Sequence, residues 1–343
     1  MNNIIAIFDT SVGTLNTGDR IIMEAVEEVI YEIIKETNIF LYRMGSHLRI
    51  SPEQKDILKN ARLKIVGGTN LFRMHYTPFI SKYNPWKIGF FDIPLLYNSL
   101  FLGVGTTVIS PSKTTFGRFK RNLAFKYSKY MWNQILSKDI PHSVRDEETL
   151  IMLEEIGIKN VINTGCPTIW NLTAEHCEKI PIKKGKDVVL TITGKKSERQ
   201  AFEYLKVAFN NYNNVYLWPQ SIVDYDYLIS LFEASNNRLK VIPSSLKSYD
   251  DLLENNDSID YIGTRLHGGI RALQHKKRTI IIAIDSRALS FRRDYNLPVI
   301  DKSELGNLEK LINSDIKTEV HLNEGKIIEF KDALRNYILE NFN

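Results

Sequence analysis

Cysteine is scarce in this chain of 343 residues, because only Cys166 and Cys177 occur. The sequence contains no Cys-x-x-Cys pair and no Cys/His spacing typical of a zinc site. Two cysteines also cannot form the disulfide framework of a small secreted domain. These absences exclude disulfide scaffolds and zinc modules, and they predict a protein of a reducing compartment.

The chain also lacks a long hydrophobic run. A helix that spans a bilayer needs roughly 20 consecutive apolar residues, and no uncharged apolar stretch of that length occurs. The first apolar run, Ile4–Phe8, ends at Asp9 and follows no basic residue. We therefore interpret it as a strand and not as a signal peptide, and we expect a cytoplasmic protein.

Positive charge is present in only slight excess. The chain has 45 Lys and Arg against 40 Asp and Glu, a formal net charge of +5. No long run of basic residues dominates the sequence, so we expect no nucleic-acid partner. A mildly basic protein suits an anionic substrate or an anionic membrane surface without requiring either one.

Short apolar runs alternate with helical patterns along almost the whole chain. Runs such as 63–66, 188–193 and 259–262 are mostly apolar, which is typical of parallel strands covered on both faces. Helices are predicted over residues 19–36, 51–61, 116–137, 146–156, 196–211, 224–233, 249–255, 268–275 and 326–339. Ser51 and Pro52 provide a typical N-cap and first helical residue.

This alternation predicts an α/β fold with two Rossmann-like, doubly wound parallel-sheet domains facing a cleft. We place the domains at residues 1–175 and 186–320, with the boundary in the polar stretch 173–186. The remaining residues, 321–343, are expected to form a helix that packs back on the first domain.

The most distinctive strand end is the segment 261–269, which reads Tyr-Ile-Gly-Thr-Arg-Leu-His-Gly-Gly. Ligands of open parallel sheets bind where strands end and helices begin. We expect the helix to begin near Gly268, with Arg265 and His267 in the turn before it. A helix N-terminus, a guanidinium and an imidazole suit a phosphate, and Gly268 and Gly269 would let the anion approach the backbone.

Other strand ends carry similar polar or glycine-rich segments. Asp146 is positioned to cap the helix that follows its strand. The segments are Asn16-Thr17-Gly18-Asp19, Gly67-Gly68, Gly103-Val104-Gly105 and Ser143-Val144-Arg145-Asp146.

These segments resemble, in this order, the motifs of polysaccharide pyruvyl transferases. Arg265-Leu266-His267-Gly268 resembles the RLHG segment of that family, and the segment 164–168, Thr-Gly-Cys-Pro-Thr, extends the match. The resemblance runs from about residue 10 to about residue 300. Each motif alone is short enough to occur by chance. Chance does not explain why all of them occur in the same order and at compatible spacing.

The resemblance implies the glycosyltransferase-B arrangement, with the donor bound in the cleft between the two domains. It implies that Arg265 and His267 hold the phosphate of phosphoenolpyruvate and that Arg145 reaches the same donor from the first domain, which would bind the acceptor. The family often carries Asp-x-Lys after the last strand, whereas this chain has Asp285-Ser286-Arg287. Arg287 is therefore the candidate partner of the donor carboxylate.

The implied reaction moves pyruvate onto two hydroxyls of a cell-surface saccharide or its lipid-linked precursor, forming a cyclic ketal. It needs placement, anion binding and proton transfer, and no metal or cofactor beyond the co-substrate phosphoenolpyruvate. We assign proton transfer to His267 and Asp19. Asn16 and Gly68 complete the expected substrate-binding residues.

Structural roles remain alternatives for several of these residues. Arg145 is also placed for an ion pair with Asp146 or Glu147, and Asp19 for a helix N-cap. Arg265 and His267 would equally suit a capped turn with a packing histidine. The glycine pairs are also typical of tight turns. His142 is expected to be either a surface residue or a packing residue.

Residues 113–138 contain seven Lys or Arg and no Asp or Glu. One interpretation is an amphipathic helix whose apolar side packs in the core. The other is peripheral contact with the anionic inner surface of the membrane, where a lipid-linked acceptor would lie. The apolar residues at helical spacing are Phe116, Phe119, Leu123, Tyr127, Tyr130 and Met131.

Three other function classes are alternatives to a pyruvyl transferase. A nucleotide-sugar-dependent glycosyltransferase would share the architecture, but no acid-rich signature for a base and ribose lies at 243–247 or 263–269. A non-catalytic sugar-binding relative is the second alternative. A nucleotide oxidoreductase is disfavoured because no G-x-G-x-x-G follows a predicted strand.

Overall fold

The computed structural model describes residues 3–78, 84–106, 115–194, 198–221, 229, 232, 235 and 238–342. The chain forms two compact units. Unit 1 consists of Met1–Thr14, Ile22–Pro167 and Asn323–Asn343, and unit 2 consists of Leu15–Ile21 and Thr168–Leu322. The expected division lay within 173–186, whereas the chain leaves unit 1 at Pro167.

Unit 1 contains a parallel sheet in the order β2-β1-β3-β4. A parallel pair, β5 and β6, continues from β4 through a bridge between Val104 and Val144. The strands are β1 (Ile4–Asp9), β2 (Phe40–Gly45), β3 (Leu63–Gly67), β4 (Ser99–Leu102), β5 (His142–Val144) and β6 (Val161–Asn163). The helices are α1 (Thr17–Ile34), α2 (Pro52–Asn60), η1 (Phe90–Leu96), α3 (Thr115–Ile135), α4 (Glu147–Glu155) and α12 (Glu324–Phe342).

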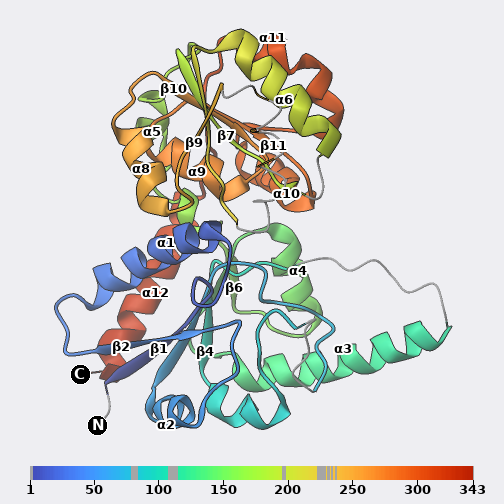
Figure 1. Cartoon of the computed structure of the whole chain (residues 1–343). Coiled ribbons are helices and arrows are strands. Elements are labelled where there is room, and N and C mark those ends of the chain that lie inside the picture. The colour runs from blue at the N-terminus through green and yellow to red at the C-terminus, as the bar shows by residue number, and fades with distance from the viewer. Residues whose placement is uncertain are drawn as a thin grey trace. The chain divides into compact units, whose positions relative to one another are not determined.

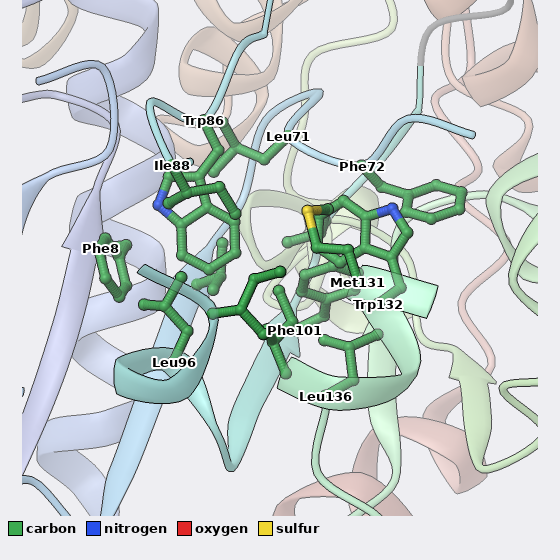
Figure 2. Packing of buried hydrophobic residues seen from close by; sticks show 14 of the residues in the cluster. Phe8, Leu71, Phe72, Trp86, Ile88, Leu96, Phe101, Met131, Trp132 and Leu136 are labelled. Atoms are coloured by element: carbon green, nitrogen blue, oxygen red, sulfur yellow. The ribbon is translucent and has the colours of Figure 1, made fainter. Parts of the chain in front are cut away.

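The core on one side of this sheet is rich in aromatic side chains (Figure 2). Trp132 of α3 is fully buried, and its ring lies 5.4 Å from Phe101 on β4 and 6.2 Å from Trp86. Large rings of this kind bury much apolar surface each and pack edge to face or stacked. The core therefore fixes the C-terminal half of α3 on the sheet.

The C-terminal helix α12 packs within unit 1 and lies beside α1 (Figure 1). Lys331 forms an ion pair with Glu32 of α1 at 2.8 Å. The amide of Asn98 donates to the hydroxyl of Tyr337 at 2.7 Å. Apolar residues of α12, including Phe330 and Leu334, are buried. These contacts attach the end of the chain to the unit in which it begins.

Unit 2 contains one six-stranded parallel sheet in the order β12-β11-β10-β7-β8-β9. Figure 1 shows α6 and α11 on one face of this sheet and α8 and α9 on the other. The strands are β7 (Asp187–Thr191), β8 (Asn214–Leu217), β9 (Leu239–Val241), β10 (Ile259–Gly263), β11 (Thr279–Ile282) and β12 (Val299–Ile300). The helices are η2 (Pro167–Ile169, which begins at the last residue of unit 1), α5 (Ala174–Glu178), α6 (Glu198–Asn211), α8 (Leu246–Glu254), α9 (Leu266–Gln274), α10 (Ser286–Tyr295), η5 (Lys302–Asn307) and α11 (Leu308–Ile312).

The predicted α/β fold with parallel sheets is confirmed, and so are two predicted helix caps. The Ser51 side chain accepts from the backbone N–H of Gln54 in a capping box, and Asp146 accepts from the N–H of Thr149. The predicted helix over 224–233 lies largely outside the described residues. Helix α10 and strand β12 were not predicted. None of the helices within the described residues is long and apolar enough to cross a membrane.

His142 is a packing residue, as one of the two interpretations stated. Its side chain is fully buried, and its Nδ1 accepts from the N–H of Phe101 at 3.3 Å. Nε2 therefore carries the proton and lies 2.9 Å from the carbonyl of Ser137. Burial lowers the pKa of His142 to about 4, so the folded protein holds a neutral ring.

We predict that His142 makes folding stability depend on pH in mildly acidic solution. The unfolded chain binds a proton at His142 near pH 6.5, whereas the folded chain binds it only near pH 4. The free energy of unfolding should therefore decrease as the pH is lowered from about 6.5 to about 4, by up to about 3 kcal/mol. Urea unfolding at a series of pH values measures this effect.

The matched variant is His142→Asn, which keeps a polar side chain but does not titrate. Its stability should decrease less steeply over the same pH range. An NMR titration of the His142 ring in the folded protein provides a direct second measurement. A ring that titrates near pH 6.5, or equal pH slopes in the two proteins, would contradict the prediction.

Candidate active site

The centre of the unit 2 sheet is the point where the chain reverses its direction of winding. From β7 the sheet continues through β8 and β9 on one side, and through β10, β11 and β12 on the other. β7 and β10 are paired, with Gly263 opposite Thr191 at their last residues. In open α/β sheets, ligands bind outside the carboxyl ends of the strands at such a switch point.

Helix α9 begins at this point, two residues earlier than the sequence analysis predicted. Arg265 is the N-cap in extended conformation, and its side chain makes no capping hydrogen bond to the first turn. His267 therefore lies in the first turn of α9 and not in the preceding loop, and it is half-buried. An uncapped helix N-terminus presents backbone N–H groups and the positive end of the helix dipole.

Glycines allow α9 to approach the sheet closely. A Cβ atom on Gly268 would lie 2.9 Å from Oε1 of Gln220 and 3.1 Å from the hydroxyl of Tyr261. A Cβ atom on Gly269 would meet the side chain of Ile281 on β11. Both glycines are therefore explained by packing against the protein interior. Close approach of an anion to the backbone, the role predicted for these glycines, stays a prediction.

Two buried tyrosines hold the first turn of α9 through its carbonyls. The hydroxyl of Tyr261 donates to the carbonyl of Arg265 at 2.7 Å, and that of Tyr249 donates to the carbonyl of Gly268 at 2.9 Å. Burial raises the pKa of both phenols, Tyr249 well above its usual value. The phenols therefore stay protonated and remain donors. The backbone that carries Arg265 and His267 is therefore held by hydrogen bonds from the buried side of α9.

Gln220 links the start of α1 to the start of α9, and sequence reasoning missed it. Its Nε2 donates to the side-chain oxygen of Asn16 at 3.0 Å, and its backbone carbonyl accepts from the N–H of Thr17 at 2.9 Å. Its Oε1 lies beside Gly268 and is buried with no hydrogen-bond partner among the described residues. The sequence signal that could have identified Gln220 was its place as a polar residue shortly after the end of β8.

Asp19 lies in the first turn of α1, in the part of that helix that belongs to unit 2. The helix cap is Asn16 and not Asp19, because the Asn16 side chain accepts from the N–H of Gly18 at 3.2 Å. The amide of Asn16 also lies 3.4 Å from the Asp19 carboxylate. Asn16 and Asp19 thus join the α9 residues through Gln220 within one unit.

The comparisons with known proteins agree with this arrangement. The family model of polysaccharide pyruvyl transferase matches residues 16–286, which is well over half of the chain. The chain belongs to the polysaccharide pyruvyl transferase family. Membership implies a transferase that modifies polysaccharide. No curated protein sequence matches the chain.

Solved structures share the fold of this pyruvyl transferase family member. UDP-N-acetylglucosamine 2-epimerase from Rickettsia bellii is 10% identical with a TM-score of 0.50, and the match covers 99% of each chain. A second UDP-N-acetylglucosamine 2-epimerase structure is 12% identical with a TM-score of 0.50, covering 99% of this chain and 94% of that one. The likeness supports two Rossmann-like units of the glycosyltransferase-B type.

Arg287 lies in the first turn of α10, where this family member has its departure from Asp-x-Lys. Its guanidinium donates to the carboxylate of Asp285 at 2.6 Å, and the side chain is 48% exposed. Asp285 is also the N-cap of α10. The structure thus gives Arg287 a local partner, and a donor carboxylate would have to compete with Asp285.

Arg145 and Gly68 belong to unit 1. Arg145 is buried and pairs with Asp146 at 3.0 Å, the structural alternative stated for it. The side chain packs against Gly105, where a Cβ atom would overlap the guanidinium. Gly68 has a φ of +57°, and Ile22 occupies the space of a Cβ atom there. Gly68 is therefore required by its turn.

Potential metal ligands do not cluster in the described parts of the chain. Over those ranges, no three His, Cys, Asp or Glu side chains lie close enough to hold a metal ion together. Cys166 and Cys177 are both buried, and neither is part of a disulfide.

We predict that Gly268→Ala destabilises unit 2, because its methyl group would displace Gln220 or the start of α9. Overpacking of a tight site costs about 1–3 kcal/mol, which corresponds to a lower Tm by about 3–10 °C. Thermal unfolding followed by circular dichroism measures the change.

The control for this prediction is Gly306→Ala, since nothing lies within 4 Å of a Cβ atom at Gly306. Its Tm should stay unchanged or rise slightly, because alanine restricts the unfolded chain. Equal Tm values for Gly268→Ala and the unmodified protein would show that α9 does not depend on this close approach.

Proposed function

We propose that this chain is a pyruvyl transferase that uses phosphoenolpyruvate as donor. It would transfer pyruvate to two hydroxyls of a saccharide and form a cyclic ketal on a cell-surface polysaccharide or its lipid-linked precursor. The observation that carries the proposal is the uncapped N-terminus of α9, with Arg265 as N-cap and His267 in the first turn, at the switch point of the unit 2 sheet.

This arrangement suits a phosphate monoester. Backbone N–H groups of a helix N-terminus and a guanidinium fork are donors that bind phosphate oxygens strongly. The tyrosine hydrogen bonds to the carbonyls of Arg265 and Gly268 keep these donors in place without occupying them. A preorganised anion site of this kind favours the negative charge that develops on a departing phosphate.

In the proposed reaction, a proton adds to the methylene carbon of the donor, and one sugar hydroxyl attacks the neighbouring carbon and loses its proton. The second hydroxyl then attacks the same carbon, the bond to the phosphate oxygen breaks, and inorganic phosphate leaves. Of the two hydroxyl protons, one balances the proton added to carbon and the other leaves with phosphate. His267 would donate to the departing phosphate, and Asp19 would serve as acid or base.

The proposal includes no metal and no organic cofactor, since phosphoenolpyruvate is a co-substrate. Arg287 is the proposed partner of the donor carboxylate, which would replace the carboxylate of Asp285 in the ion pair with Arg287. Arg145 would act on the donor only if its pair with Asp146 opens, so it is a weaker candidate than Arg265.

We predict that phosphoenolpyruvate binds saturably to the purified protein and that Arg265→Ala weakens binding about 10- to 100-fold, because one charged donor is lost. His267→Ala should lower turnover by about two orders of magnitude. Calorimetry measures binding, and release of inorganic phosphate measures turnover once an acceptor is found.

Arg293→Ala is the matched control, because Arg293 is an exposed arginine of α10 paired with its neighbour Asp294. It should bind phosphoenolpyruvate like the unmodified protein. UDP-sugars and NADH serve as alternative ligands. Binding of a UDP-sugar without binding of phosphoenolpyruvate would replace the proposal by a nucleotide-sugar-dependent glycosyltransferase.

A further inference from the structure

We propose that the outward face of α3 is a docking surface for an anionic lipid bilayer. The proposal rests on unit 1 alone and is independent of the donor chemistry proposed above. It concerns a surface patch, here called the α3 stripe, that consists of Phe119, Leu123 and Tyr130 together with the neighbouring Lys126 and Lys129.

The apolar members of the α3 stripe are exposed to solvent. Phe119 is 67% exposed, Leu123 61% and Tyr130 51%. Their spacing of four and seven residues places them on one side of the helix. Met131 and Trp132 point from the opposite side into the core of unit 1 (Figure 2).

One of the two interpretations of this helix therefore needs correction. The sequence pattern allowed all the apolar residues of α3 to pack in the core, and that is wrong for Phe119, Leu123 and Tyr130. It holds for Met131, and Tyr127 is partly buried against the same core. Phe116 lies outside the described side chains. Helix α3 thus has two apolar sides, and only one of them is covered within unit 1.

Basic side chains flank the exposed apolar residues. Lys126 and Lys129 lie on one flank of the stripe and Lys120 on the other, and all three are exposed. Lys126 and Lys129 have no ion-pair partner among the residues that the structure describes. Long lysine side chains can reach lipid phosphates while neighbouring apolar groups enter the bilayer.

The positive charge of the whole chain is concentrated in this region. The segment from Ile93 to Lys138 contains no Asp or Glu, and seven of its residues are Lys or Arg. Without those seven, the chain has 38 basic residues against 40 acidic ones, because the totals are 45 and 40. The remainder of the protein therefore has a formal net charge of −2, from 38 basic and 40 acidic residues, and the excess of positive charge over the whole chain comes from this segment.

The combination of charge and exposed apolar groups distinguishes a bilayer from other anionic partners. A nucleic acid or an acidic polysaccharide would be attracted by lysines alone and would leave Phe119 and Leu123 in water. A second copy of the chain would bring a second set of lysines against the first. A bilayer with anionic headgroups satisfies both the lysines and the apolar side chains.

The experiment is co-sedimentation of the full chain with vesicles of phosphatidylcholine containing about one third phosphatidylglycerol, at low and at high salt. We expect binding to these vesicles at low salt, weaker binding at high salt, and little binding to phosphatidylcholine alone. The double variant Phe119→Ser/Leu123→Ser should reduce partitioning about 100-fold. Lys126→Glu/Lys129→Glu should reduce it at least about 30-fold.

Matched control variants separate the α3 stripe from general surface effects. Ile328→Ser removes an apolar side chain of α12 that is 57% exposed. Lys59→Glu/Lys326→Glu reverses two exposed lysines on other helices of the same unit. Both should bind vesicles like the unmodified protein. Circular dichroism checks that each variant is folded, which we expect because every altered side chain is exposed.

Three outcomes would overturn the proposal. The first is the absence of binding to the anionic vesicles at low salt. The second is equal loss of binding in the stripe variants and in the matched controls. The third is a dimer in sedimentation equilibrium that Phe119→Ser/Leu123→Ser dissociates while no vesicle binding occurs, because the α3 stripe would then face a second copy.

Discussion

The close approach of α9 to the unit 2 sheet determines what the candidate site can do. This approach is possible because Gly268 and Gly269 carry no side chain where α9 meets Tyr261 and Ile281. The two tyrosine hydroxyls then bind carbonyls of the first turn from the buried side. Those bonds use carbonyls and not amides, so the tyrosines do not occupy the N-terminal N–H groups of α9. The tyrosine hydrogen bonds thus hold the backbone of Arg265 in place.

The two ends of the unit 2 sheet are built differently. At the amino ends of the strands, Arg278 is buried and pairs with Asp260 at 2.8 Å, and it also donates to carbonyls of Ile312 and Ser314. A buried pair whose guanidinium also donates to backbone carbonyls holds neighbouring segments together. At the carboxyl ends, Gln220 keeps a buried oxygen without a partner among the described residues. The buried ion pair that holds unit 2 together therefore lies at the amino ends of the strands, and the candidate site lies at their carboxyl ends.

Local sequence signals predicted what is decided locally. The caps at Ser51 and Asp146 depend on residues three positions apart, and the parallel strands follow from their apolar runs. The link between Asn16 and Gln220 spans 204 positions in the sequence, so no local pattern could reveal it. The start of α9 was misplaced because Gly268 and Gly269 resemble a turn, whereas the packing against Tyr261 and Ile281 makes them helical. The outward apolar side of α3 was equally hidden, since burial depends on which elements cover a helix.

The choice between arginine and lysine separates the two anionic contacts proposed for this protein. Arginine presents a rigid fork that fixes the orientation of one phosphate, and lysine is a flexible point charge that adapts to many. The candidate donor residue at the helix start is Arg265, whereas the exposed cations Lys126 and Lys129 line the α3 stripe. Within α3, Arg121 instead donates to His75 at 3.0 Å, and burial together with this guanidinium lowers the pKa of His75. Arg121 thus supports the fold, whereas Lys126 and Lys129 are exposed and suit a surface that has no fixed geometry.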